Sequence, residues 1–468
     1  MGALARVLTS AVLVAAPAAT AAPALAVSPP PVDSRLLPEP APAAPSFPTE
    51  QSEPCVTDTI AATHQPDVRP DMQSRPDLQS AWIRTQGAGQ TVAVIDTGVA
   101  RHRLLPHLAP GGDYVADGDG STDCDGHGTI VAGIVGAAPD AATGFSGIAP
   151  DVNILGIRQS STKFRVVDAA SGGVGDVDSL AMAVRSAADQ GATIINISSV
   201  ACLGVDDALD DRALGAALAY AVDVRNAVVV AAAGNVGGQG TCPKQNPLPD
   251  PAGSGQPDWD RIDVVASPSW YDDYVLTVGS VDVEGVPSDF TLAGPWVDVA
   301  APGEAVISLS TIGEGLVDTV PGQAEPQQIS GTSYAAPVVS GIAALVRALA
   351  PQLTARQVMH RIESTARGPA SGWNPLVGNG VVDVLAAVHG ITGPAAAAEP
   401  QPFEQQPAAA TRDDSGRFAL IGTAVCVVLA ASAVLVPTVR SRRRADAVAG
   451  EGVPHDGSSR DAEFGSTR

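Results

Sequence analysis

The sequence has few positively charged residues. Its 468 residues include 27 Lys and Arg against 50 Asp and Glu, which gives a formal net charge of -23 at pH 7. Proteins that bind nucleic acid need a cationic surface to meet the phosphate backbone, so this composition argues against nucleic acid as a partner. A well-solvated surface explains the acidity, and selection for basic substrates is the alternative interpretation.

Cysteine is also scarce, with 5 residues and no Cys-x-x-Cys pair. Without such a pair, a zinc site is only a weak alternative. The sequence also lacks an internal repeat and a compact carboxylate loop that would hold an ion. Residues 117–125 are acidic but rich in glycine, and we interpret them as a solvated loop. We therefore expect neither a metal nor another cofactor.

Both ends of the chain carry targeting signals. Residues 1–26 place a basic residue before a short apolar stretch and end in Ala24-Leu25-Ala26, which is typical of a secretory signal peptide. Residues 418–439 are apolar apart from three hydroxyl side chains and extend roughly 33 Å as a helix, enough to cross a bilayer. Four arginines follow, which places the tail in the cytoplasm and the preceding chain outside. A buried core helix is the alternative interpretation of residues 418–439.

The exported cysteines predict two disulfide bonds. An even number of cysteines in an oxidising compartment is typical of a disulfide-bonded protein. We interpret Cys426, within the membrane stretch, as a small apolar residue. The four exported cysteines are Cys55, Cys124, Cys202 and Cys242.

The region between two segments rich in proline and alanine has the pattern of an α/β domain. The flanking segments, 27–48 and 393–416, favour extended chain. Continuous apolar runs predict strands buried on both faces of a parallel sheet, and they alternate with stretches of helical spacing. This alternation predicts a doubly wound, mostly parallel sheet with helices on both faces. The expected strands are 91–95, 152–157, 193–197, 227–233 and 275–281, and the expected helices are 179–190, 209–224, 333–349 and 355–365.

Three short motifs carry reactive side chains. In α/β sheets such side chains lie beyond the carboxyl ends of the strands. Val94-Ile95-Asp96-Thr97-Gly98 puts a carboxylate at the end of a strand, and Gly126-His127-Gly128-Thr129 sets an imidazole between glycines. Gly331-Thr332-Ser333-Tyr334-Ala335 puts a serine in the first turn of a helix, where free N–H groups favour negative charge. Pro337 leaves the Ser333 carbonyl without its usual helical partner. Taken singly, the motifs also fit a turn, an incidental histidine and an N-cap serine.

Together the three motifs resemble the subtilase family, in which Asp, His and Ser occur in this order and in these contexts. The resemblance runs from about residue 82 to residue 388 and implies a serine endopeptidase that works through an acyl-enzyme. It implies Ser333 as the nucleophile, His127 as the base and Asp96 as the group that orients the imidazole. It also implies that Asn235 donates a hydrogen bond to the oxyanion, with an Asn-capped strand end as the alternative.

The same family binds peptides as an added strand along two segments. The resemblance assigns Ser198, Ser199 and Val200 to one segment and Ala232 and Gly234 to the other. The family often has glycine where this sequence has Val200. We therefore expect the branched side chain to narrow the pocket and to restrict the substrates that enter.

Secreted subtilases typically carry a folded inhibitory propeptide, and the sequence before Asp96 leaves little room for one. Four cysteines allow three pairings. We propose a Cys55–Cys124 bond, which would hold the extension beside His127, and a Cys202–Cys242 bond between two loop insertions.

The whole arrangement looks like the mycosins, the membrane-anchored subtilases of type VII secretion systems. This resemblance implies peptide or protein substrates, partners among the membrane proteins of a secretion complex, and a protease domain on the outer face of the cytoplasmic membrane. The implied function is the processing of secretion substrates, and the alternative is a structural stabiliser of the complex with accessory proteolysis. The expected regions are a signal peptide 1–26, an extension 27–80, a protease domain 81–392, a linker 393–417, a transmembrane helix 418–439 and a cytoplasmic tail 440–468.

Overall fold

The computed structural model describes most of the chain between the two targeting signals. The described residues are 27–56, 76–169, 172–207, 209–237, 242–248, 255–320, 326–369 and 372–391. The expected signal peptide, the linker after residue 392, the membrane helix with Cys426 and the cytoplasmic tail lie outside the described residues. These four assignments stay predictions.

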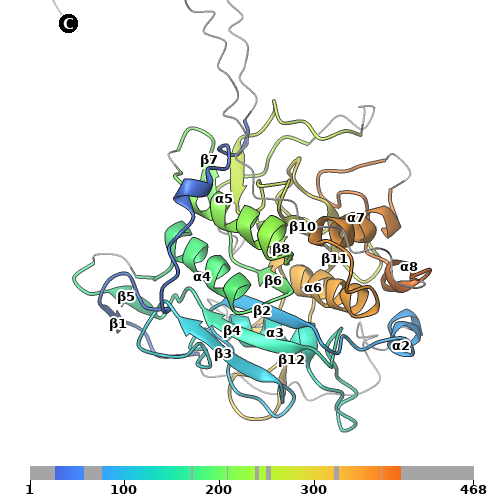
Figure 1. The fold of residues 1–468 in the computed structure, drawn as a ribbon, viewed down its shortest axis with the longest axis horizontal. Helices are drawn as coiled ribbons and strands as arrows, with labels where there is room; N and C mark the ends of the chain where they lie inside the picture. Colours follow the sequence, from blue (N-terminus) through green and yellow to red (C-terminus); the bar gives the residue numbers. More distant parts are fainter. Residues whose placement is uncertain are drawn as a thin grey trace, which may run out of the picture. The chain divides into compact units, whose positions relative to one another are not determined.

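A parallel sheet of seven strands forms the centre of the domain (Figure 1). Its inner strands are buried along almost their whole length, as expected for strands covered on both faces. All five predicted strands are present within one residue of the expected bounds, so the predicted doubly wound fold is confirmed. In order across the sheet the strands are β11 (Val299–Pro302), β10 (Leu276–Val281), β8 (Val228–Ala232), β6 (Ile194–Ile197), β2 (Thr91–Asp96), β4 (Asn153–Arg158) and β3 (Leu108–Asp113).

The two edge strands, β3 and β11, lie outside the predicted set. The sequence of β3 is Leu-Ala-Pro-Gly-Gly-Asp, and its register against β4 shifts between Pro110 and Gly112. Proline and glycine weaken the apolar pattern of a strand and are tolerated at an edge, where one side needs no ladder hydrogen bonds. The β11 strand is only 4 residues long and ends in a proline, Pro302.

Helices cover both faces of the sheet (Figure 1). α4 packs beside α5 on one face, and α3 packs beside α6 on the other. The predicted helix 209–224 is shorter than expected, because α5 ends at Ala219 and a π-helical turn continues to Val224. The helices are α2 (Pro76–Trp82), α3 (His127–Gly136), α4 (Val177–Asp189), α5 (Arg212–Ala219), α6 (Thr332–Leu349), α7 (Ala355–Thr365) and α8 (Val384–Val388).

α6 is the central helix of the domain. Among the residues that the structure describes, it is the one helix long and apolar enough to cross a membrane. Most of its side chains are buried against the sheet and against α3, so its apolar character belongs to the core of the domain. Its first turn carries Ser333, and the sheet therefore fixes the position of this serine directly.

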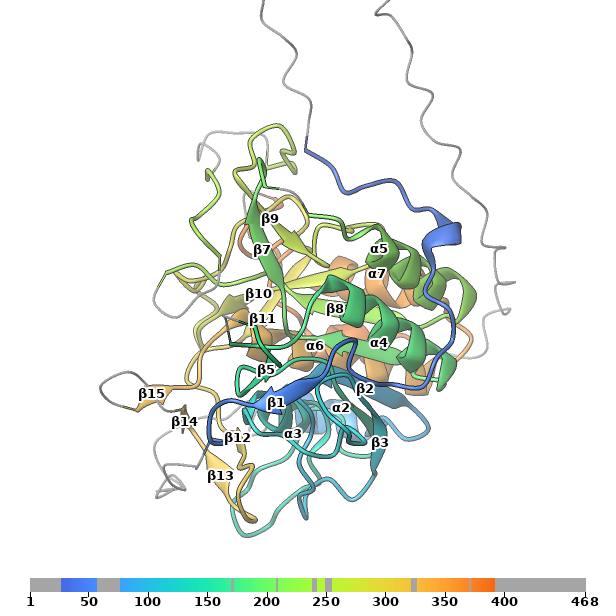
Figure 2. The ribbon, with the colours of Figure 1, turned by 90° about the vertical axis from the view of Figure 1, so that its left-hand side faces the viewer.

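The N-terminal extension wraps around the domain. Residues 27–48 have no regular secondary structure apart from a short 3-10 turn, η1 (Ser34–Leu36). They do not form a free linker, because Val27, Val32 and Leu37 pack against the core. Figure 2 shows this segment in blue as it passes α5 and α4 and ends in β1 (Thr49–Gln51). β1 pairs in antiparallel fashion with β5 (Phe164–Val166), which lies between β4 and α4 in the chain.

Two disulfide bonds brace the carboxyl edge of the sheet. Cys55 is joined to Cys124, and the Val56 N–H donates to the Cys124 carbonyl at 2.8 Å. Cys202, on β7 (Ala201–Gly204), is joined to Cys242 in the loop after β8. The sulfur atoms of this second bond lie against Gly234, where an added Cβ would come within 2.9 Å of the Cys242 Sγ.

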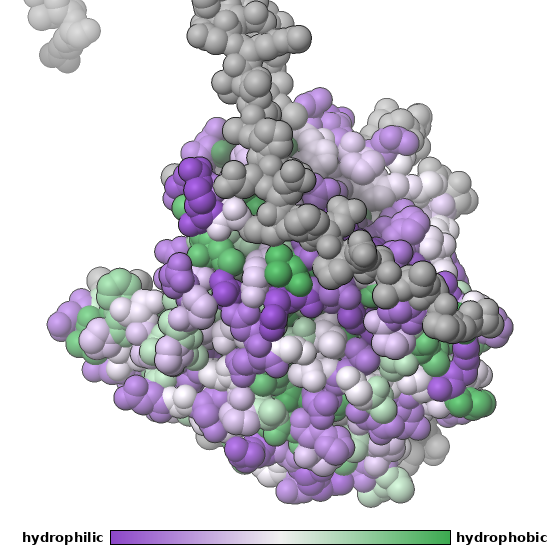
Figure 3. All heavy atoms as spheres, in the orientation of Figure 1, coloured by the Kyte–Doolittle hydropathy of each residue, from purple (hydrophilic) through white to green (hydrophobic). Residues whose placement is uncertain are grey.

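The surface is predominantly hydrophilic on the face shown in Figure 3, with apolar residues in small groups. Several of the few cations are paired with carboxylates, as in Arg103 with Asp140 at 2.8 Å and Arg212 with Asp210 at 2.6 Å. The Arg212–Asp210 pair is exposed on both sides and adds little stability, whereas Asp140 is buried beneath Arg103.

Replacing Cys55 and Cys124 together by alanine is expected to lower the free energy of unfolding by about 2–4 kcal/mol, because the crosslink restricts the unfolded chain. Urea unfolding under oxidising conditions measures this change, with the unchanged chain as reference. An unfolding midpoint equal to that of the reference would show that the crosslink does not hold the extension on the domain.

Candidate active site

The three predicted motifs meet at the carboxyl edge of the sheet. Asp96 is the last residue of β2, His127 is the first residue of α3, and Ser333 is the second residue of α6. His127 and Ser333 line the same cleft, and Asp96 lies fully buried behind the imidazole. The structure therefore brings together three residues that are up to 237 positions apart in the chain, from Asp96 to Ser333.

The Asp96 carboxylate orients the imidazole. Its Oδ1 lies 2.7 Å from His127 Nδ1 and also accepts a hydrogen bond from the Thr97 N–H at 2.7 Å. A carboxylate in this position places the imidazole proton on Nδ1 and leaves Nε2 free to act as a base. The His127 side chain is 27 % exposed, so the ring still faces the cleft while Asp96 does not.

Two opposing effects set the pKa of His127. Burial disfavours the charged ring and lowers its pKa, while the charge of Asp96 and the hydrogen bond to it raise the pKa. The contributions of the carboxylates outweigh burial, and the pKa of His127 lies above the ordinary value of 6.5. This environment favours the imidazolium that forms when the ring accepts a proton.

In the loop 117–125, residues 117–119 and Thr122 are exposed as expected, but Asp123 is bonded within the protein. It accepts hydrogen bonds from Thr97 Oγ1 at 2.8 Å, from the Gly126 N–H at 2.8 Å and from Thr129 Oγ1 at 2.6 Å. Burial raises the pKa of this carboxyl to about 6. Asp123 thus connects Thr97, which follows Asp96, with Gly126 and Thr129, which lie on either side of His127. In the sequence, an aspartate three residues before a glycine, as in Asp123 and Gly126, is typical of a turn that the aspartate side chain closes. This is the signal that could have identified Asp123.

Glycines allow the aspartate and histidine motifs to touch. Gly98 has a φ of +101°, in the left-handed region. A Cβ on Gly128 would lie 2.0 Å from the Gly98 carbonyl oxygen. Any side chain at Gly128 would therefore push α3 away from β2 and lengthen the bond between Asp96 and His127.

Ser333 is not the N-cap of α6. The N-cap is Gly331, and it makes no capping hydrogen bond through a side chain. Ser333 lies two residues further inside, within the first turn, where backbone N–H groups have no helical partner. The next residue, Tyr334, packs on the imidazole of His127 with 5.1 Å between the ring centroids. The nucleophile candidate and the base candidate are therefore held on adjoining surfaces.

Asn235 faces the cleft with a defined amide orientation. Its Oδ1 accepts hydrogen bonds from the Thr332 N–H at 2.9 Å and from Thr332 Oγ1 at 3.0 Å. The carboxamide oxygen is thereby occupied, and Nδ2 remains as a donor beside Ser333 in the lining of the cleft. These bonds run to α6 and not to the end of β8, so the strand-cap alternative does not describe this side chain. Thr332 was not among the predicted site residues.

The structure brings only one of the two expected peptide-binding segments to the cleft. Ser198, Ser199 and Val200 line it, with the Val200 side chain partly exposed. Ala232 and Gly234 are absent from its lining. The Ala232 carbonyl accepts from Ser269 Oγ at 2.6 Å, and the Gly234 N–H donates to Thr332 Oγ1 at 3.2 Å. These two backbone groups therefore bond within the protein, and the peptide-binding role of Ala232 and Gly234 stays a prediction.

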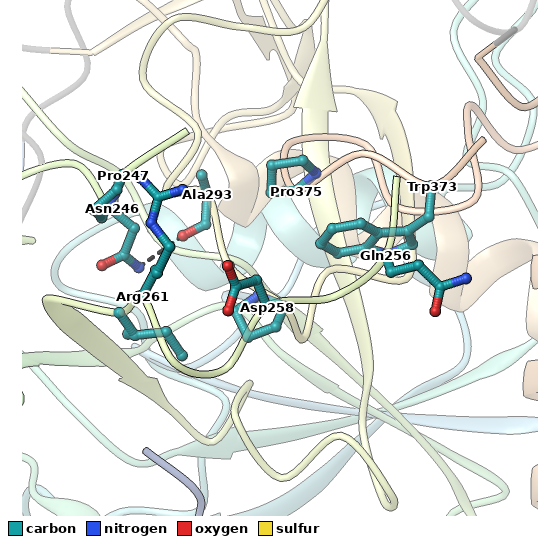
Figure 4. A pocket seen from close by; sticks show the side chains of 11 residues that line it. Asn246, Pro247, Gln256, Asp258, Arg261, Ala293, Trp373 and Pro375 are labelled. Carbon is teal, nitrogen blue, oxygen red and sulfur yellow. Dashed lines mark hydrogen bonds between the residues drawn. The ribbon is translucent and has the colours of Figure 1, made fainter. Parts of the chain in front are cut away.

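The cleft has a volume of about 800 Å³. The connection between β4 and α4 lines one part of it together with Val56 from the extension, and residues 309–320 contribute further lining. Figure 4 shows a second hollow, which has a volume of about 30 Å³ and is lined by residues such as Asn246, Arg261 and Trp373. That volume accepts little more than a water molecule, so the cleft at Ser333 is the better candidate for a peptide. Within the described part of the chain, no group of three His, Cys, Asp or Glu side chains is arranged to hold a metal ion.

The chain is similar to one protein family, one relative and two solved structures. Residues 87–380 match the Subtilase family. Mycosin-4 of Mycobacterium tuberculosis (strain ATCC 25618 / H37Rv) is 56% identical over 437 residues, which cover 91% of this chain and 94% of that protein. The structure of MycP3 protease from the type VII (ESX-3) secretion system is 45% identical with a TM-score of 0.72, covering 77% of this chain and 99% of that one. A chain in the structure of an intact ESX-5 inner membrane complex is 39% identical, with a TM-score of 0.72. The match covers 88% of this chain and 100% of that one.

Replacing Asn235 by alanine is expected to lower kcat about 10²–10³-fold with little change in KM, because the donor acts on charge that develops in the transition state. Steady-state kinetics on a peptide that the unchanged enzyme cleaves gives both constants. Asn153→Ala, an exposed amide on β4, is the matched control and should leave kcat unchanged. Equal kinetics for the two variants would exclude a role of Asn235 in catalysis.

The pH dependence of kcat/KM tests the coupling of Asp96 and His127. Only the neutral imidazole accepts a proton, so activity should fall as the pH falls through the His127 pKa, with a midpoint above the ordinary 6.5. Asp96→Asn removes the charge that favours the imidazolium, and it should move this midpoint to lower pH while kcat falls about 10⁴-fold. Asp119→Asn, at an exposed aspartate, should leave the profile in place. If Asp96→Asn leaves the midpoint of the fall in kcat/KM at low pH unchanged, the coupling of Asp96 with His127 is contradicted.

Proposed function

The chain belongs to the subtilase family and, within it, to the mycosins, and from this premise we propose that Asp96, His127 and Ser333 form its catalytic triad. Subtilases of this kind are serine endopeptidases, and this chain is one. The observation that carries the residue assignment is the 2.7 Å contact between His127 Nδ1 and Asp96 Oδ1, behind a cleft that Ser333 lines.

In the proposed reaction, Ser333 Oγ attacks the carbonyl carbon of the scissile peptide bond. His127 Nε2 takes the hydroxyl proton and then gives it to the leaving amine, so the C–N bond breaks and an acyl-enzyme remains. A water molecule, activated by the same imidazole, hydrolyses the ester and restores Ser333. Asp96 holds the orientation of the imidazole throughout and stabilises the imidazolium.

The negative charge of the tetrahedral intermediate falls on the former carbonyl oxygen. Asn235 Nδ2 and the Ser333 N–H are the two donors that we assign to it. This assignment is supported by the two bonds that Thr332 makes to Asn235 Oδ1, since they fix the amide before any substrate enters. A donor that is already oriented needs no reorganisation during the reaction.

We place this chemistry outside the cytoplasmic membrane. The support is the apparent signal peptide 1–26, the apolar stretch 418–439 and the arginines after it. In this arrangement the protease domain is tethered close to the membrane through the linker 393–417. The two disulfide bonds agree with an oxidising compartment.

We propose that the substrates are proteins of a type VII secretion system. A relative of this chain occurs in the ESX-5 inner membrane complex, which supports partners among the membrane proteins of such a system. Val200 in the cleft lining narrows the space for a substrate side chain, which favours selective processing over general degradation.

The same relative supports a second function, which is to stabilise the secretion complex. A component of a membrane complex contributes surfaces as well as chemistry, and this contribution does not require the triad. The two functions are compatible in one chain, and a single substitution separates them.

Replacing Ser333 by alanine at the native expression level is expected to abolish peptide cleavage, with a loss in turnover of about 10⁶-fold, because the nucleophile is removed. Ser364→Ala, on the exposed side of α7, is the matched control and should leave turnover unchanged. Cleavage that persists in Ser333→Ala would show that the triad assignment is wrong.

Secretion measured in the same strains distinguishes the two functions. If secretion continues in Ser333→Ala but stops when the chain is deleted, the structural role is supported. If Ser333→Ala stops secretion as completely as deletion of the chain does, proteolysis is the essential function.

A further inference from the structure

The carbonyl of Ser333 has an unusual partner. In an α-helix the carbonyl of residue 333 accepts from the N–H of residue 337, but Pro337 has no N–H and its ring clashes with that carbonyl. Ser198 supplies the missing donor, because its Oγ donates to the Ser333 carbonyl at 2.8 Å. A side chain that follows β6 therefore completes the first turn of α6.

The orientation of the Ser198 hydroxyl is fixed by two further buried side chains. Asn196 Nδ2 donates to Ser198 Oγ at 2.9 Å, and Ser340 Oγ donates to Asn196 Oδ1 at 2.8 Å. Because Ser198 Oγ accepts from Asn196, its own hydrogen is directed to the Ser333 carbonyl. Asn196 and Ser340 are 0% exposed and Ser198 is 3% exposed, so water does not compete for these bonds.

This chain of hydrogen bonds begins and ends on the same helix. Ser340 and Ser333 are about two turns apart on α6, and Asn196 and Ser198 connect them across the carboxyl end of β6. These three hydrogen bonds therefore fix both the distance and the rotation of the first turns of α6 relative to the sheet. The peptide unit after Ser333 is held at its oxygen, and this restricts the backbone dihedral that directs the Ser333 side chain.

We propose that Ser198 is a positioning residue for the nucleophile, acting through its hydrogen bond to the Ser333 carbonyl. This inference rests on the proposed role of Ser333. Ser198 also belongs to the cleft lining with Ser199 and Val200, where the backbone of a peptide substrate would bind. One residue thus connects the segment that receives the substrate with the turn that carries the nucleophile.

Positioning and substrate binding make different kinetic predictions. A residue that only binds substrate changes KM, whereas a residue that aligns the attacking oxygen changes kcat. Ser198→Ala removes the hydroxyl and keeps the backbone that contacts the substrate. We expect it to lower kcat about 10- to 100-fold with KM unchanged, because a small misplacement of reacting groups has effects of this size.

Pro337 provides the decisive control. Pro337→Ala restores an N–H that can bond to the Ser333 carbonyl, so the hydroxyl of Ser198 becomes dispensable. We expect Ser198→Ala to lower kcat much less in the Pro337→Ala background than in the native background. Purified single and double variants, compared by kcat and KM and checked by circular dichroism, complete this cycle.

Three results would overturn the inference. They are an unchanged kcat in Ser198→Ala, an effect confined to KM, and an equal loss of kcat in both backgrounds at position 337. Ser340→Ala is a further test that leaves Ser198 in place. It should lower kcat as Ser198→Ala does, but by a smaller factor. If Ser333→Ala retains cleavage, the proposed function fails; if Ser333→Ala is inactive while Ser198→Ala equals the unchanged enzyme, only the positioning role fails.

Discussion

The hydrogen bond between the buried Asp96 carboxylate and His127 is the interaction on which the site depends. It joins the end of β2 to the start of α3, and its 2.7 Å length requires the two elements to approach closely. Gly128 permits that approach, and Asp123 holds the backbone on both sides of it. Burial of Asp96 is costly for a charged group, and the contacts of Oδ1 with His127 and the Thr97 N–H offset part of that cost, while Oδ2 is buried without a hydrogen-bond partner among the described residues.

The rest of the site is organised around this bond by supports that come from distant parts of the chain. The Cys55–Cys124 bond ties the extension close to His127, and the Cys202–Cys242 bond packs under Gly234, directly before Asn235. α6 contributes Ser333, together with the Thr332 groups that orient Asn235. Each functional side chain is therefore fixed by the sheet on one side and by a crosslink or hydrogen-bond network on the other.

Much of this arrangement can be predicted from the sequence, and the remainder follows a physical pattern. The inner strands and α7 are predictable because continuous apolarity and a capping box at Thr354 are local signals. The edge strand β3 is not, since proline and glycine interrupt its pattern. Asp123 and the Asn196–Ser198–Ser340 network also escape prediction, because their roles depend on burial and on bonds between residues far apart in the chain. The peptide-binding role of Ala232 and Gly234 stays a prediction, and their bonds to Ser269 and Thr332 depend on the tertiary fold in the same way.

The central claim is that Ser333 is a nucleophile activated by an imidazole that Asp96 orients. Treatment of the chain with a serine-directed fluorophosphonate, followed by peptide mass spectrometry, tests this claim directly. The account predicts one adduct, on Ser333, which forms at neutral pH and is suppressed when His127 is protonated. An adduct on another serine, or labelling of Ser333 that does not depend on His127, would contradict it.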